Sequence, residues 1–464
     1  MLKATVALGA SCLALVGAAQ AAETDGEDAR DARIRELEAR LERLERLEAA
    51  AAPAQTDPVR VTLNNGRATV QTEDARFAVR GMVQFDAATY DQDGVGPQDL
   101  NSGTNFRRAR IGAEGQVDDW SYELTYEFGG SGQEDPGKVL AAWIEYGGLG
   151  PWRVRIGAQA PSIGLDDSTS ATDTLFLERA AAAEMARGVA AGDGRAAIAV
   201  SGGGDNWFAS LAATGAVAGN GASYDEQLGF VGRLAIAPIR TDALTLHLGA
   251  SVTEVTQLAD LSAGTGLDSV QLRERPELRV DGARLVDTGQ LTADGIALTG
   301  AEAGLQWGRL FASGEFITYT IDRPGAVSDA EFEGWHLQAA WSLTGERRLW
   351  SKKNGAFASE RVAAAFNPDE GDWGAWELAG RWSVLDLNDN ETNVGAASTL
   401  GAPTNIVRGG RQEIASVGVN WRPNGLLRFM LDYQHAEIER MDAAGVTDIG
   451  QAFDAVSLRT QLAF

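Results

Sequence analysis

Trp120-Ser121-Tyr122-Glu123-Leu124-Thr125-Tyr126-Glu127-Phe128 is the stretch that decides the fold, because apolar and polar side chains alternate through it without interruption. Successive side chains of a β-strand point to opposite faces, so this period of two predicts a strand with one aromatic face and one charged face. The same alternation recurs in four later segments, which are Trp152–Gly157, Trp335–Trp341, Trp376–Trp382 and Leu427–Tyr433. The chain beyond Val59 is therefore predicted to be all-β.

Two architectures share this alternation. A soluble sandwich turns its apolar faces into a shared core, whereas an outer-membrane barrel turns them toward lipid and its polar faces toward a water-filled lumen. Aromatic pairs at strand ends, such as Trp335 with Trp341 and Trp376 with Trp382, fit the interface girdles of a barrel. The last segment, Val456–Phe464, also alternates and ends the chain on an aromatic residue. We expect the barrel-assembly machinery to recognise this terminal strand through Phe464.

The length sets the size of the barrel. Residues 75 to 464 provide 390 positions, and a spanning strand with its connection uses about 24 residues, which gives about 16 strands. A ring of that size encloses an aqueous channel. The predicted fold is a transmembrane antiparallel β-barrel of about 16 strands, surrounded by outer-membrane lipid and preceded by a short coiled-coil helix.

The N-terminal part reads as two smaller segments. Residues 1–21 have a charged start, an apolar run and a small-residue cleavage site at Ala19-Gln20-Ala21, which predicts a secretory signal peptide. Residues 22–58 contain a heptad seam followed by a linker, and the seam consists of Ile34, Leu37, Leu41 and Leu44. A short coiled coil and a solvated single helix both fit it, because two heptads are marginal alone in water. The barrel is predicted to occupy 59–464.

Composition excludes several classes of function. The chain has 40 Lys and Arg against 65 Asp and Glu, a formal charge of −25, which argues against a nucleic-acid partner. With one cysteine, inside the predicted signal peptide, and three histidines, we expect no metal and no cofactor. An enzyme is not predicted, since His247 and His435 follow apolar runs, as interface histidines do, and His336 has no adjacent serine motif.

The sequence resembles the phosphate-selective porin O and P family across most of the chain. The segments that carry the resemblance are Phe106–Gly112, Trp120–Phe128, Ile156–Leu165, Thr174–Arg179, Arg284–Gly289, Gly334–Glu346, Gly374–Ala379 and Gly418–Asn424. The resemblance implies a homotrimer of 16-stranded barrels in the outer membrane of a Gram-negative bacterium. It also implies an anion-conducting pore that is narrowed by an inward-folded loop.

Arginines on the polar faces of the strands are the candidate lumen residues, because charges lining a pore select ions and the guanidinium fork matches phosphate oxygens. They are Arg80, Arg108, Arg110, Arg153, Arg155, Arg381, Arg428 and Arg459. The paired arginines of the family match Arg107 and Arg108, although strict alternation turns Arg107 outward unless the strand bends.

A second basic cluster lies in a long connection and is predicted to form a funnel at the mouth of the pore. It comprises Arg273, Arg275, Arg279 and Arg284. The alternative for the strand arginines is a wall of mixed charge, in which they pair with carboxylates of neighbouring strands. The candidate partners are Glu114, Glu123, Glu127, Glu377 and Asp432.

The predicted constriction loop departs from the family pattern. It carries Asp166 and Asp167 where phosphate-binding members carry lysines, and Ala158 stands where an arginine is usual. Two unit charges 4 Å apart interact by about 4 kcal/mol at an intermediate dielectric, so these aspartates would oppose phosphate at the narrowest point. A structural turn packed against the barrel wall is the other interpretation.

Together these features predict a porin for passive diffusion of small solutes, with small anions such as phosphate or polyphosphate as permeants. The alternative is a non-selective or cation-preferring general porin that also anchors the outer membrane to the cell wall through its coiled coil.

Overall fold

The computed structural model describes residues 33, 36–43, 59–64, 66–92, 98–130, 137–219, 225–259, 268–359 and 361–464. The predicted signal peptide, the linker and most of the predicted coiled coil lie outside the described residues. Two units are distinguished, Met1–Val59 and Arg60–Phe464. In the first, residues 36–43 are helical and expose Leu37 and Leu41. Association of this helix with other copies stays a prediction.

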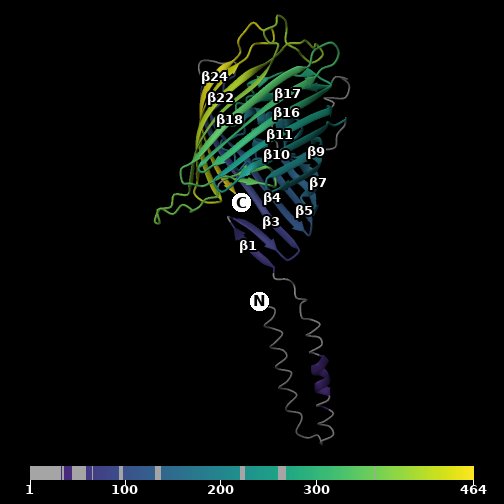
Figure 1. Ribbon diagram of the computed structural model, residues 1–464, viewed down its shortest axis with the longest axis vertical. Coiled ribbons are helices and arrows are strands. Elements are labelled where there is room, and N and C mark those ends of the chain that lie inside the picture. Colours follow the sequence, from purple (N-terminus) through teal and green to yellow (C-terminus); the bar gives the residue numbers. More distant parts are fainter. Residues whose placement is uncertain are drawn as a thin grey trace. The chain divides into compact units, whose positions relative to one another are not determined.

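Sixteen strands of the described chain form a closed antiparallel barrel, which confirms the predicted fold and strand number. Figure 1 shows them inclined around a common axis. Each pairs with its neighbours in chain order, and the last pairs with the first, from Ala463 opposite Met82 to Phe453 opposite Gln92. The strands are β3 (Ala75–Gln92), β4 (Gly103–Val117), β5 (Trp120–Glu127), β6 (Lys138–Leu149), β7 (Trp152–Gln159), β8 (Arg195–Gly204), β9 (Trp207–Val217), β10 (Leu228–Arg240), β11 (Leu244–Gln257), β16 (Gly295–Trp307), β17 (Leu310–Asp322), β18 (Ala330–Ser342), β21 (Ala375–Asp389), β22 (Val407–Arg422), β23 (Leu427–Glu439) and β24 (Gln451–Ala463).

The two ends of the barrel differ. At one, here called the turn end, most connections are short, such as 118–119 and 308–309. A hairpin of β1 (Arg60–Asn64) and β2 (Arg67–Gln71) also lies there and continues the sheet beside β3. At the opposite loop end the connections are longer. They carry α3 (Leu165–Ser168), α4 (Ala181–Ala190), β12 (Ser269–Val270), β13 (Arg273–Glu274), β14 (Val286–Asp287) and β15 (Leu291–Thr292).

The outer surface of the wall is apolar, as the alternation predicts. β18 alternates buried and exposed residues along nearly its whole length. On β5, Trp120 and Leu124 are more than half exposed, at 52% and 59%, while Glu123 and Glu127 of the same strand lie inside and bind arginines. No helix in the described part of the chain combines the length and the apolar character needed to cross a bilayer.

The interior is packed around α4 at the loop end. Ala181, Ala182 and Ala186 are buried, and the hydroxyl of Tyr319 on β17 donates to the carbonyl oxygen of Ala182 at 2.6 Å. A Cβ at Gly334 of β18 would lie 2.6 Å from the Ala182 Cβ. Small residues on both elements therefore allow the helix to approach the inner wall, and the barrel is not hollow at this level.

Candidate functional site

The segment from Ala160 to Gly194 enters the barrel and narrows it. α3 and α4 lie on this segment, and Asp166, Glu178 and Arg179 are all buried. Arg179 holds its turns together, since its guanidinium donates to the carbonyl oxygens of Asp166 at 3.0 Å and Thr169 at 2.8 Å. We call this segment the constriction loop.

Glu178 fixes the constriction loop to the wall through a cluster of arginines. Arg107 binds its carboxylate with Nε at 2.7 Å and Nη2 at 2.9 Å, and Arg459 of β24 binds it at 2.9 Å. Arg108 and Arg279 lie within 3.8 Å and 3.6 Å of it. Burial by itself raises the pKa of Glu178, but the four guanidinium groups outweigh it and hold that pKa well below its usual range.

A β-bulge places both Arg107 and Arg108 inside. In the pairing of β3 with β4, Gln84 lies opposite Arg108 and Phe85 lies opposite Phe106, so Arg107 has no partner. The extra residue lets two consecutive side chains face the lumen, and both are buried. This is the bend that strict alternation requires before Arg107 can turn inward.

Asp166 and Asp167 have different environments. The Asp166 carboxylate accepts the backbone N–H of Ala180, the N-cap of α4, at 3.0 Å. Asp167 binds Nε of Arg187 on α4 at 2.7 Å. The first aspartate thus holds the loop together, and the second stands in an ion pair.

A second segment folds inward from the turn end. It is the hairpin of β19 (Leu349–Ser351) and β20 (Ala356–Ala358) in the long connection between β18 and β21. Trp350 donates from Nε1 to Nδ1 of His247 at 2.9 Å, and His247 Nε2 lies 2.8 Å from the Glu302 carboxylate. Arg233 joins Glu302 to the carbonyl oxygens of Asn354 and Gly355, both at 2.7 Å.

Three cavities follow one another between these segments. The outer cavity, at the loop end, has a volume of about 500 Å³, and the middle cavity one of about 240 Å³. The inner cavity, toward the turn end, has about 600 Å³. The outer and middle cavities share Arg187 and Asp193, and the middle and inner cavities share Asn354. Neighbouring cavities of the described lumen are therefore bordered by common residues.

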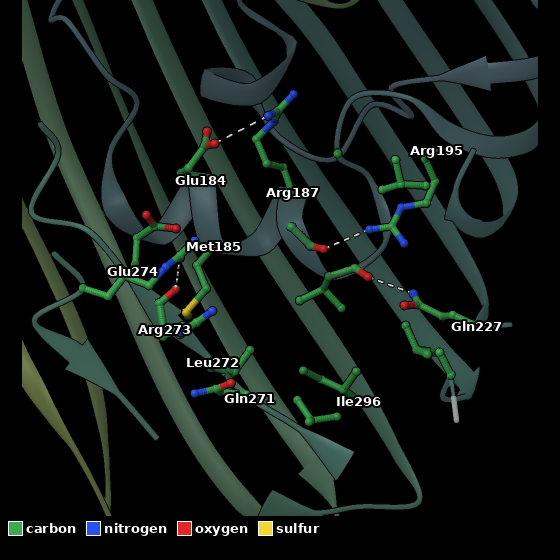
Figure 2. A pocket seen from close by; sticks show the side chains of 18 of the residues that line it. Glu184, Met185, Arg187, Arg195, Gln227, Gln271, Leu272, Arg273, Glu274 and Ile296 are labelled. Atoms are coloured by element: carbon green, nitrogen blue, oxygen red, sulfur yellow. Dashed lines mark hydrogen bonds and ion pairs between the residues drawn. The ribbon is translucent and has the colours of Figure 1, made fainter. Parts of the chain in front are cut away.

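Each cavity has more basic than acidic lining residues. The outer one has seven basic and three acidic residues, and Figure 2 shows Arg187, Arg195 and Arg273 around it. The middle one has four basic and two acidic residues, and the inner one five and three. A fourth cavity of about 620 Å³ lies at the turn end and is also lined by more basic than acidic residues, which are Arg67, Arg76 and Arg422 against Asp173.

Most of the predicted residues lie in this series. Arg80, Arg153 and Arg155 line the inner cavity, and Arg108, Arg110 and Asp167 line the middle one. The lining of the outer cavity includes Arg273, Arg275 and Arg279. Asp166, Arg107 and Arg381 line none of the four cavities described above.

Arg381 holds two loops together. Its guanidinium binds Glu277 at 2.6 Å, donates to the Glu178 carbonyl oxygen at 3.0 Å and lies 4.5 Å from the Phe176 ring centroid. The mixed-charge alternative is also visible in part, because Arg80 pairs with Glu123 at 2.8 Å and Arg110 pairs with Glu127.

Sequence reasoning missed the charges of α4 and of the hairpin. Arg187 and Asp193 line the outer and middle cavities, Glu184 and Arg195 line the outer one, and Asn354 lines the middle and inner ones. A signal for α4 was present, since the alanine-rich run around 180–191 has no period of two and places Glu184 and Arg187 three residues apart, as on a helix face. No local signal indicates that the hairpin turns inward.

Comparison with known proteins identifies the family. The family model for phosphate-selective porin O and P matches residues 77–464. Porin O of Pseudomonas aeruginosa is 25% identical over 430 residues, covering 87% of this chain and 93% of that protein. An uncharacterized protein of Caulobacter vibrioides is 28% identical over 367 residues, covering 78% of this chain and 68% of that protein.

Among solved structures, OprB of Pseudomonas putida has a TM-score of 0.50 at 9% identity, covering 84% of this chain and 94% of that chain. That likeness concerns the fold alone. The family match extends over nearly all of the barrel, and the chain belongs to the phosphate-selective porin O and P family of outer-membrane channels.

Proposed function

We propose that this channel conducts small anions in preference to cations, with phosphate and polyphosphate among its permeants. The supporting observation is the excess of basic residues in each of the four cavities of the barrel, although the whole chain carries a formal charge of −25. Low-dielectric walls focus the field of nearby charges into a narrow space. The charges that line the lumen, rather than the charge of the whole protein, therefore decide which ions enter.

The middle cavity is the smallest of the four, so a permeating ion passes closest to its charged residues there. Its basic residues are Arg108, Arg110, Arg179 and Arg187, and its acidic residues are Asp167 and Asp193. Both carboxylates bind Arg187, at 2.7 Å and 2.9 Å. Their charges therefore neutralise that guanidinium and act only weakly on a passing ion. Arg110 pairs with Glu127, and Arg179 donates to carbonyl oxygens of the loop, so Arg108 is the arginine whose forked donors best suit phosphate oxygens. This agrees with the description of the family as phosphate-selective.

Reversal potentials across a potassium chloride gradient in planar bilayers test the proposal. We expect the sign of an anion-selective pore, and we expect Arg108→Gln to reduce the anion preference. Arg411→Gln is the matched control, because Arg411 belongs to the outer face of β22 and pairs there with Glu413 at 2.6 Å. A wild-type reversal potential on the cation side would refute the proposed function.

We further propose that the channel is a homotrimer and that it is exported with a cleaved signal peptide. The heptad seam of Ile34, Leu37, Leu41 and Leu44 supports association, and the N-terminal charge and apolar run support export. Native light scattering in detergent should give the mass of three chains, and a single-chain mass would reject the trimer. Mass spectrometry of the purified protein should place its first residue after Ala21.

Recognition by the barrel-assembly machinery through Phe464 is part of the same proposal. The backbone of Phe464 pairs with Gly81 of β3, with N–O distances of 2.9 Å and 3.0 Å, so the last residue belongs to the seam that closes the barrel. Deleting Phe464 should lower the amount of protein in the outer membrane of cells. Folding of the purified chain in detergent is the control and should change much less.

A further inference from the structure

The outer cavity combines two kinds of lining that an inorganic anion does not need together. One is basic and consists of residues such as Arg195, Arg273 and Arg284. The other is apolar and consists of Met185, Val189, Val255, Leu258, Leu272 and Ile296. Figure 2 shows Arg195 and Arg273 on opposite sides, with Leu272 and Ile296 below them.

Arg195 is the group that points to a ligand. The residue is only 6% exposed, and its guanidinium donates to the carbonyl oxygens of Gly188 at 2.9 Å and Gly215 at 3.1 Å. Its Nε is buried without a hydrogen-bond partner among the described residues. A buried cation held by carbonyl oxygens alone keeps a large part of its desolvation penalty, and an anion in the cavity would offset it.

The apolar residues of the cavity are as deeply buried as a protein core. Met185, Val255, Leu272 and Ile296 are each 5% exposed or less, yet they line a space of about 500 Å³. Pockets for small organic ligands have volumes of about 300–1,000 Å³, and the outer cavity has such a volume with a lining as rich in charged residues as in apolar ones. A phosphate ion would occupy only a small part of this volume and would gain nothing from the apolar side.

We propose that the outer cavity binds small organic anions in which a phosphate or carboxylate group is attached to an apolar carbon skeleton. The anionic group would bind at Arg195 and the neighbouring arginines, and the skeleton would lie against Val255, Leu272 and Ile296. This inference rests on the proposed anion preference and extends it to a class of substrate. The site would concentrate such solutes at the mouth of the pore, above the constriction loop.

The test compares two phosphate monoesters that differ only in the apolar group. Phenyl phosphate and methyl phosphate are added at pH 8, above their second pKa of about 6, and the concentration of each that halves the single-channel chloride current is measured. We expect phenyl phosphate to bind about tenfold more tightly, which corresponds to about 1.4 kcal/mol. Equal concentrations for the two esters would overturn the inference.

Variants separate the two halves of the site. Val255→Thr keeps the branched shape but places a hydroxyl in the apolar side, and it should reduce the phenyl phosphate preference several-fold while leaving methyl phosphate unchanged. Val231→Thr is the matched control, because Val231 is equally buried in the neighbouring strand β10 but does not line the cavity. Arg195→Gln should weaken the binding of both esters.

Failure of this inference can be distinguished from failure of the proposed function. A channel that is anion-selective by reversal potential but treats the two esters alike contradicts the inference alone. A cation-selective channel contradicts the proposed function. If Val231→Thr loses as much of the phenyl phosphate preference as Val255→Thr does, the cavity is wrongly assigned. The comparison of the two esters on the wild-type protein does not depend on the folding of any variant.

Discussion

Asp166 and Asp167 are adjacent in sequence but differ in what they bind, so the same substitution should act differently at each. Asp167 lines the middle cavity and neutralises Arg187 at 2.7 Å. Asp167→Asn should therefore leave a positive charge at the constriction and move the reversal potential further toward the anion side. Asp166→Asn is the matched comparison and should change selectivity little, because its carboxylate is buried against the Ala180 N–H.

The Asp166→Asn variant should instead affect the stability of the folded protein. An asparagine can still accept the Ala180 N–H through its side-chain oxygen, but the hydrogen bond loses its charge, which costs about 1 kcal/mol. Thermal unfolding measured by circular dichroism should show a small decrease for Asp166→Asn. Equal shifts of the reversal potential in the two variants would place both carboxylates on the conduction path.

Glu184, the acidic residue of α4, should make the stability of the constriction loop depend on pH. Burial opposes the charge of Glu184, but Arg187 at 3.5 Å and Arg279 at 2.7 Å outweigh it and lower its pKa to about 2 from about 4.5. Because the pKa is lowered in the folded protein, the stabilisation is complete above about pH 4.5 and is lost as the pH falls toward 2.

Pepsin, which works at acid pH, can measure this. The constriction loop should resist cleavage at pH 4 and become susceptible near pH 2. Glu184→Gln should be cleaved at pH 4 already, since the charge is then absent at every pH. Protection of this variant equal to that of wild type at pH 4 would show that Glu184 does not hold the loop.

At the level of elements, the bulge in β4 makes a deletion more informative than a substitution. Removing Arg107 restores one-to-one pairing between β3 and β4 and leaves the alternation on both sides of it in phase. The barrel should therefore still close. Glu178 loses its bidentate partner and keeps the single hydrogen bond from Arg459 at 2.9 Å, so the constriction loop is held less firmly and should become more accessible to proteases.

Deletion of Ile111 is the control for this experiment. Ile111 lies in the regular part of β4, opposite Gly81 and Tyr126, so its removal turns one half of the strand inside out. This variant should fail to give the heat-modifiable barrel band on gels that the Arg107 deletion still gives. An Arg107 deletion that also fails to fold would show that the bulge is required for closure.

The sequence predicted the elements that have a period and missed those that do not. The nine residues from Trp120 to Phe128 predicted a strand that the structure places at Trp120–Glu127, and the chain length predicted sixteen strands. Alternation reports only the face to which a residue belongs. It therefore could not show that a bulge turns Arg107 inward, or that the β19–β20 hairpin folds into the lumen, because contacts between distant segments such as Trp350 with His247 determine that.

Alternation also limits what the sequence indicates about the candidate site, and the role of its residues in conduction stays a proposal. Eight strand arginines were identified because they occupy polar faces, and each of them lines a cavity or binds the constriction loop directly; they are Arg80, Arg108, Arg110, Arg153, Arg155, Arg381, Arg428 and Arg459. The partners that turn some of these arginines into structural residues, above all Glu178, come from loops. Their positions depend on the folded loop and have no local pattern in the sequence.

For the whole molecule, the sign of the charge differs between outside and inside. The chain carries a formal charge of −25, and acidic residues such as Glu331, Glu333, Glu437 and Glu439 are exposed at the loop end of the outer wall. The cavities of the lumen have a basic excess. The outer carboxylates act on a permeating ion from farther away than the arginines of the lumen do. Added salt screens the distant charges first, so the ionic strength can distinguish the two contributions.

Screening predicts the outcome. The Debye length is about 30 Å at 0.01 M salt and about 3 Å at 1 M, so outer carboxylates can repel anions from the mouth only in dilute salt. Replacing Glu331 and Glu333 by Gln should raise the anion preference at 0.01 M and leave it unchanged at 1 M. Arg108→Gln should lower it at both, because a permeant in the middle cavity passes within a few ångströms of that guanidinium. Reversal potentials measured at both salt concentrations check this, and a selectivity that is independent of salt in all three proteins would show that size rather than charge selects the ions.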